Sequence, residues 1–128
     1  MKRSASATWN GGLKDGAGTF SVMSGAIREQ KLSFRTRFED APGTNPEELI
    51  AAAHASCFSM ALGAQLGERG VTPEAIETTS SITFENLTLT KSVLKTTVKA
   101  RGADKAKVGC PISKVLKLEI VLELTVAT

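Results

Sequence analysis

The stretch from Pro46 to Glu68 constrains the fold most, because it is apolar on nearly every side of the helix that it predicts. Asn45 can cap this helix, Pro46 suits its first helical position, and Gly70 is placed to end it. A helix of this length runs about 34 Å and needs burial on most sides. We therefore expect another element, beyond one small sheet, to pack against it.

Segments that alternate apolar and polar residues lie before and after this helix in the sequence. They predict an α+β fold, with an antiparallel sheet wrapped on the long central helix. Before the helix, the expected strands cover residues 4–9, 18–25 and 32–38. After it, they cover residues 76–85, 93–100 and 117–126, with a short helix at residues 112–116. The chain of 128 residues has no internal repeat and no linker, so we expect a single domain over residues 1–128.

Charge and hydropathy argue against nucleic-acid and membrane partners. The 16 basic residues are scattered, the net charge is only +3, and the chain has five Phe, one Trp and no Tyr. A phosphate-binding surface needs clustered cations. No run approaches the roughly 18 apolar residues of a membrane span, and no apolar segment of signal-peptide length follows the basic start. We expect a cytoplasmic protein whose thiols are kept reduced.

Two cysteines, Cys57 and Cys110, are then either inert or redox-active. Cys57 lies eleven residues beyond Pro46, about 16 Å along the helix and out of reach of the helix dipole. Apolar surroundings alone would raise the pKa of its thiol and leave it unreactive. A reactive Cys57 therefore needs a cation from another element. Arg35 and Arg37, on one face of the expected third strand, are the nearest candidates.

Glu47 raises a geometric question, because ten residues, or about 15 Å of helix, separate it from Cys57. Two antiparallel copies of the helix, related by a two-fold axis near Ala52, would bring Glu47 of one chain level with Cys57 of the other. The residues around Ala52 are small enough for a close approach. We therefore expect an isologous homodimer with shared active sites.

Each of these residues also has a purely structural interpretation. Cys57 is compatible with an inert core position, Glu47 with stabilisation of the first helical turn, and Arg37 with a solvated strand face. His54 lies one turn before Cys57, and a hydrogen-bonded core histidine is favoured over a Cys–His pair. Two cysteines and one histidine show no ligand spacing, so no metal site is expected.

Several motifs resemble the OsmC/Ohr family, and specifically its OsmC branch. They are Phe34–Glu39, Gly43–Leu62 and Gly109–Leu116, with further agreement at Ala7–Trp9 and at Gly18–Gly25. The resemblance covers nearly the whole chain. It implies an intertwined homodimer in which two sheets wrap a pair of central helices. It also implies an enzyme that reduces organic hydroperoxides with two cysteines and without metal, flavin or other cofactor.

The resemblance assigns roles to four residues. Cys57 would be the peroxidatic thiol and Cys110 the resolving thiol, while Arg37 and Glu47 would activate Cys57 and position the peroxide. A Cys57–Cys110 disulfide would then be reset by a dihydrolipoyl group or another dithiol. An apolar lining would favour organic hydroperoxides over hydrogen peroxide. We expect that lining to include Leu49, Phe58 and Met60.

The segment before the second cysteine departs from the family, because only Arg101–Lys107 stands where a helix of a dozen or more residues is usual. Either the chain is shortened there, or the sequence lacks some residues of that segment. Two other functions remain as alternatives. One is a dimer that binds a small apolar ligand and in which Cys57 is vestigial. The other is a redox sensor that changes its partner contacts when the disulfide forms. Turnover with added dithiol, lost in Cys57→Ser, separates the enzyme from the binding protein.

Overall fold

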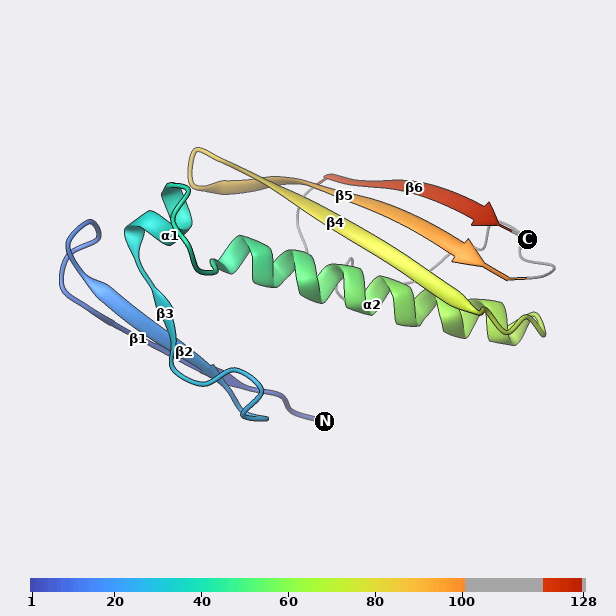
Figure 1. Ribbon diagram of the computed structural model, residues 1–128, viewed down its shortest axis with the longest axis horizontal. Coiled ribbons are helices and arrows are strands. Elements are labelled where there is room, and N and C mark those ends of the chain that lie inside the picture. Colours follow the sequence, from blue (N-terminus) through green and yellow to red (C-terminus); the bar gives the residue numbers. More distant parts are fainter. Residues whose placement is uncertain (101–118, 128) are drawn as a thin grey trace. The chain divides into compact units, whose positions relative to one another are not determined.

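The computed structural model describes residues 1–100 and 119–127 (Figure 1). The chain forms two compact units, Met1–Pro46 and Glu47–Thr128, and each is described by itself. The single domain over residues 1–128 stays a prediction.

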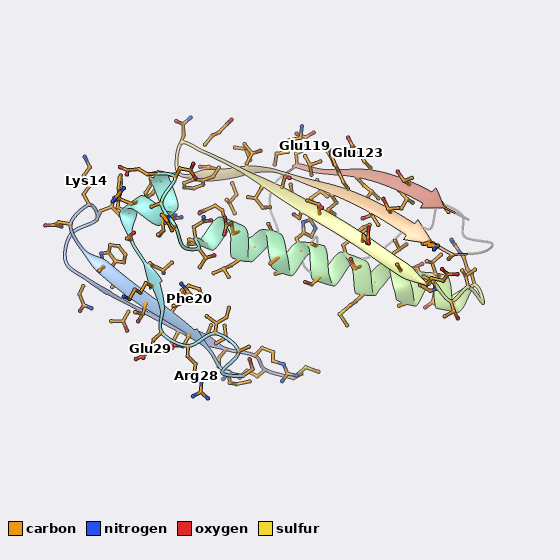
Figure 2. The ribbon with its side chains drawn as sticks, in the orientation of Figure 1. Lys14, Phe20, Arg28, Glu29, Glu119 and Glu123 are labelled. Atoms are coloured by element: carbon orange, nitrogen blue, oxygen red, sulfur yellow. The ribbon has the colours of Figure 1, made fainter. Side chains whose placement is uncertain are left out.

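The first unit is a three-stranded antiparallel sheet followed by a short helix. Neighbouring strands pair in the order β1-β2-β3. Phe20 on β2 is the large side chain most deeply buried in this unit (Figure 2). The elements are β1 (Ala5–Asn10), β2 (Ala17–Val22), β3 (Gln30–Leu32) and α1 (Phe34–Phe38).

The strand predicted over residues 32–38 is wrong over most of its length, because α1 takes its place. Ser33 caps this helix: its Oγ accepts a hydrogen bond from the backbone N–H of Thr36 at 3.2 Å, and Thr36 Oγ1 accepts one from the N–H of Ser33 at 3.0 Å. Such a reciprocal capping box satisfies two amides that the start of a helix leaves without partners. Phe34 and Phe38, one turn apart, add a ring contact with centroids at 4.8 Å.

The second unit packs one long helix along a three-stranded sheet (Figure 1). Its elements are α2 (Pro46–Glu68), β4 (Ala75–Glu85), β5 (Thr88–Lys99) and β6 (Glu119–Ala127). The predicted helix bounds are confirmed. At its end, Gly70 adopts a φ of +74° and the N–H of Val71 donates to the carbonyl of Leu66 at 2.9 Å. This left-handed glycine terminates the helix as expected.

The core of the second unit lies between α2 and the sheet. Phe58, Leu62 and Leu66 of α2 meet Leu94 and Val98 of β5, and each of these side chains is at most 5% exposed. The opposite face of the sheet is polar. There Glu119 and Glu123 of β6 point away from α2 (Figure 2), and Glu123 forms an ion pair of 3.7 Å with Lys95 of β5.

The second sheet is mixed and not wholly antiparallel. β4 and β5 pair antiparallel through a turn at Asn86 and Leu87, whereas β6 pairs parallel to β5. Parallel neighbours require a crossover connection, and here that connection includes residues 101–118. The helix predicted at residues 112–116 falls there, outside the described residues. The predicted α+β class, with β-sheets and one long helix, is confirmed.

By length and composition alone, α2 is long and apolar enough to cross a membrane, with a mean hydropathy of 1.4 in its most apolar window. The sequence prediction had recognised no run of that kind. One such helix is weak support for a membrane span, because core helices pass the same test. Here β4, β5 and β6 cover one side of α2, and polar His54 is buried on that side. The side of α2 that faces the sheet is therefore part of the core of this unit, although only 22% of the most apolar window is buried.

Candidate active site

Arg37 lies on α1, in the first unit, and its surroundings differ from those of Arg35. The Arg35 Nε atom lies 3.2 Å from a Glu39 carboxylate oxygen, and both side chains are exposed. The guanidinium of Arg37 lies over the ring of Phe38, with its Cζ atom 5.3 Å from the ring centroid. The prediction that Arg35 and Arg37 share one face of a strand is wrong. Both lie on a helix, where side chains two positions apart point in directions about 200° apart.

An apolar hollow of about 220 Å³ lies beside Arg37 in the first unit. Aromatic and aliphatic side chains from β1, β3, α1, the loop after β1 and the first residue of α2 form most of its wall, and Arg37 and Ser33 are the polar side chains on it. Its lining is Trp9, Leu13, Leu32, Ser33, Phe34, Arg37, Phe38 and Pro46. A hollow of this kind accepts an apolar group and leaves a cation at its edge.

Glu47 and Cys57 lie in the second unit, both on α2. The helix is continuous from Pro46 to Glu68, so their separation of ten positions corresponds to about 15 Å along its axis. Glu47 is in the first turn, where a carboxylate also stabilises the helix through its dipole. One copy of α2 therefore cannot bring the carboxylate of Glu47 to the thiol of Cys57.

The Cys57 side chain is half-buried and packs against the core cluster of the second unit. The three predicted substrate contacts on α2 have different environments. Phe58 is 5% exposed within the core, Leu49 is half-buried, and Met60 is 77% exposed. At about 100° per residue, Leu49 and Met60 project from one side of α2 and Phe58 from the opposite side. Their role as a common lining stays a prediction.

His54 is a buried, hydrogen-bonded residue. Its side chain is 0% exposed, and its Nδ1 atom lies 2.8 Å from the hydroxyl of Ser92 on β5. Burial lowers the pKa of His54 below its ordinary value, which favours the neutral ring. The geometry agrees with the core interpretation of this histidine that the sequence favoured.

Cys110 lies outside the described residues, so its distance from Cys57 is not part of this structure. Within residues 1–100 and 119–127, no group of three or more His, Cys, Asp or Glu is arranged to hold a metal ion. The expectation of a site without metal or cofactor stays a prediction.

The side of α2 that faces away from the sheet is apolar and exposed. The exposed residues there are small except for Met60, and no charged residue lies between Leu49 and Gly67. They are Ala52, Ala53, Ser56, Met60, Ala64 and Gly67. This set is called the outer stripe below. It includes Ala52 and Ala53, and the close approach of a second helix there stays a prediction.

Sequence reasoning missed the apolar hollow and the hydrogen-bond partner of His54. Phe34 and Phe38 carried a usable signal, because their spacing of four residues fits one face of a helix as well as an alternating strand. Trp9 and Leu13 were not singled out, since their role depends on how the hairpin meets α1. Ser92 gave no signal, as a serine in a strand is ordinarily exposed.

Comparison with known proteins gives a full-length relative and a family match. The sequence model described as "OsmC-like protein" matches residues 38–125. The protein named Peroxiredoxin OsmC from Escherichia coli (strain K12) is 47% identical over 136 aligned residues, covering 96% of this chain and 95% of the relative.

The chain belongs to the OsmC family. Its fold is that of solved OsmC and Ohr structures. An OsmC-like protein from Mycoplasma pneumoniae matches with a TM-score of 0.74 and 15% identity, covering 100% of this chain and 99% of that one. The organic hydroperoxide resistance protein OhrB of Bacillus subtilis matches with a TM-score of 0.64 and 24% identity, covering 95% and 98%.

The family assignment confirms the resemblance that the motifs indicated. The alignment with the Escherichia coli OsmC protein is longer than the 128-residue chain, so some positions of that relative have no counterpart here.

Proposed function

We propose that this OsmC-family chain is a cysteine-based peroxidase that reduces organic hydroperoxides to alcohols. The observation that carries the proposal is the 47% identity to a protein named Peroxiredoxin OsmC over 96% of the chain. Such a reaction needs a thiol and a cation beside an apolar surface. The half-buried Cys57 on α2 is the thiol, and Arg37 on the apolar hollow of the first unit is the cation.

In this mechanism the thiolate of Cys57 attacks the distal oxygen of the hydroperoxide. The S–O bond forms as the O–O bond breaks, and the alkoxide takes a proton and leaves as an alcohol. Cys57 is oxidised to a sulfenic acid. The thiol of Cys110 then attacks that sulfur, an S–S bond forms, and water leaves. A dithiol such as a dihydrolipoyl group reduces the disulfide and becomes a disulfide itself.

Arg37 is the cation that activates Cys57 and holds the peroxide in this proposal. Its guanidinium presents several N–H donors and stays charged at all physiological pH values. The neighbouring hollow has room for the alkyl or aryl group of the substrate. Burial of that group favours organic hydroperoxides over hydrogen peroxide, which has no apolar part.

A second copy of the chain completes the site. The unbroken α2 helix separates Glu47 from Cys57, and the outer stripe offers a small-residue surface without charge. A two-fold axis near Ala52 would place Glu47 of one chain level with Cys57 of the other, and the start of the outer stripe, at Ala52, Ala53 and Ser56, would then face the partner helix. The carboxylate of Glu47 would there orient Arg37 through charge-assisted hydrogen bonds.

Steady-state turnover tests the enzymatic function. Purified protein is given cumene hydroperoxide with dihydrolipoic acid, and alcohol formation is followed by chromatography. The proposal predicts many turnovers per chain, none with Cys57→Ser, and slower turnover with hydrogen peroxide. A single oxidation per chain without turnover would favour the redox sensor. Binding of cumyl alcohol without oxidation of Cys57 would favour the apolar ligand-binding dimer.

A further inference from the structure

His54 of α2 and two serines of the sheet form a hydrogen-bonded chain that is buried at His54 and Ser92 and half-buried at Ser80. Ser92 Oγ lies 2.8 Å from His54 Nδ1 and 3.3 Å from Ser80 Oγ, so the chain runs from α2 through β5 to β4. His54 and Ser92 are both 0% exposed. The proposed reaction uses none of these three residues, so the burial of His54 and Ser92 needs another explanation.

A second polar chain joins α2 to the same two strands further along the helix. The hydroxyl of Ser59 donates to Thr78 Oγ1 on β4 at 2.7 Å, and Thr78 Oγ1 lies 3.1 Å from Thr96 Oγ1 on β5. Thr96 is 2% exposed. Among the described residues, no buried side-chain nitrogen or oxygen lacks a hydrogen-bond partner. Both chains are therefore satisfied, as a stable buried network requires.

The two polar chains hold different sides of α2. His54 begins the row of side chains at four-residue spacing that faces the sheet, and Phe58 is the next member of that row. Ser59 projects about 100° to one side of Phe58, and Cys57 about 100° to the other. A hydrogen bond on each of two sides fixes the rotation of a helix about its axis. Apolar packing alone is not directional and fixes that rotation less strictly.

We propose that these two chains, His54–Ser92–Ser80 and Ser59–Thr78–Thr96, are a positioning device that sets the rotation of α2 and with it the direction of the Cys57 thiol. All six are positioning residues and none touches the substrate. The sulfur lies about 5 Å from the helix axis, so a rotation of about 20° moves it by nearly 2 Å. A displacement of about 1 Å at a reacting atom can slow a reaction roughly 100-fold.

The test measures the reactivity of Cys57 toward iodoacetamide as a function of pH, in a Cys110→Ser background that leaves one thiol. Thr78→Val removes the hydroxyl at nearly constant volume, and Thr78→Ser retains it. Ser92→Ala breaks the other chain. Thr97→Val is the matched control, because Thr97 is exposed on the opposite face of β5.

We expect Thr78→Val and Ser92→Ala to lower the alkylation rate about threefold to tenfold, or to shift the midpoint of its pH profile. Thr78→Ser should restore the rate, and Thr97→Val should leave it unchanged. Urea unfolding of each variant checks that the protein is folded under the conditions in which its alkylation rate is measured. If Thr78→Val and Ser92→Ala lower stability but leave both the rate and the midpoint unchanged, the residues are merely structural and the proposal is overturned.

The positioning proposal rests on the proposed function only for its catalytic consequence. Alkylation needs no peroxide, so a protein inert to cumene hydroperoxide can still show the predicted change in thiol reactivity. In that case the positioning device stands and the peroxidase proposal fails. If the wild-type protein turns over peroxide rapidly and the variants show an unchanged alkylation rate and midpoint, the peroxidase proposal stands and the positioning proposal fails.

Discussion

Glu47 and Cys57 lie on one unbroken helix, ten residues apart, so the chain that carries the thiol cannot also supply the carboxylate beside it. About 15 Å of helix separates them. A shared site predicts complementation between chains. Glu47→Gln and Cys57→Ser should each be nearly inactive alone, because each homodimer lacks one required group.

Co-refolding equal amounts of the two variants tests this relationship. Half of the dimers formed at random are mixed, and each mixed dimer has one complete site, so about a quarter of the wild-type activity should return. Mixed dimers isolated with two affinity tags provide the direct measurement. Activity that stays at the level of the separate variants would contradict a shared site.

Arg37 and Arg35 offer a matched pair on α1. Arg37 lies beside the apolar hollow, whereas Arg35 is paired with Glu39 at the surface. We expect Arg37→Ala to slow the oxidation of Cys57 by about 10-fold to 100-fold, the effect of losing a charged hydrogen bond. Arg35→Ala should change the rate less than twofold, since exposed ion pairs contribute little. Stopped-flow measurement of Cys57 oxidation by cumene hydroperoxide gives the rate for each variant. Equal effects of the two substitutions would show that Arg37 has no special role in the site.

The apolar hollow should control substrate preference. Leu13 lines it and is 60% exposed, so Leu13→Ser removes apolar contact at little cost to folding. We expect the KM for cumene hydroperoxide to rise about fivefold, and the rate with hydrogen peroxide to stay unchanged. Leu87→Ser, at an exposed leucine in the β4–β5 turn, is the control. A parallel loss of rate with both peroxides would indicate that the hollow does not hold the substrate.

His54 should make the stability of the protein depend on pH. Burial lowers its pKa below the ordinary value of 6.5, so the unfolded chain binds this proton more readily than the folded one. The free energy of unfolding should therefore be insensitive to this group above pH 6.5, and should fall as the pH drops below 6.5 toward the lowered folded-state pKa.

Urea unfolding between pH 5 and pH 8 measures this dependence, and His54→Gln is the control because glutamine does not titrate in this range. Below pH 6.5, the free energy of unfolding should fall less steeply with decreasing pH in His54→Gln than in the wild-type protein. Identical slopes in the wild-type protein and the variant would show that other groups cause the pH dependence.

The sequence predicted α2 well because its signals are local. Pro46 fits only the start of a helix, Gly70 adopts the left-handed conformation that ends one, and no strong breaker lies between them. The segment after Leu32 was predicted wrongly because its alternation competes with a capping box. Two side chain–backbone hydrogen bonds between Ser33 and Thr36 favour the helix there.

Other features depend on contacts between distant residues and leave little trace in local patterns. The parallel pairing of β6 with β5 is set by a crossover that strand alternation does not reveal. The burial of Ser92 follows from the position of His54, 38 residues earlier. The roles of Cys57, Cys110, Arg37 and Glu47 came from the family resemblance, and they stay proposals.

Thiol titration after one equivalent of cumene hydroperoxide is the sharpest test of whether Cys57 and Cys110 reduce peroxides together. Reduced protein is mixed with the peroxide, quenched within seconds, and its remaining thiols are counted and located by mass spectrometry. We expect loss of both thiols and a Cys57–Cys110 disulfide in the wild-type protein, with the thiol of Cys110 retained in Cys57→Ser. Thiols that persist for minutes in the wild-type protein would contradict the peroxidase mechanism.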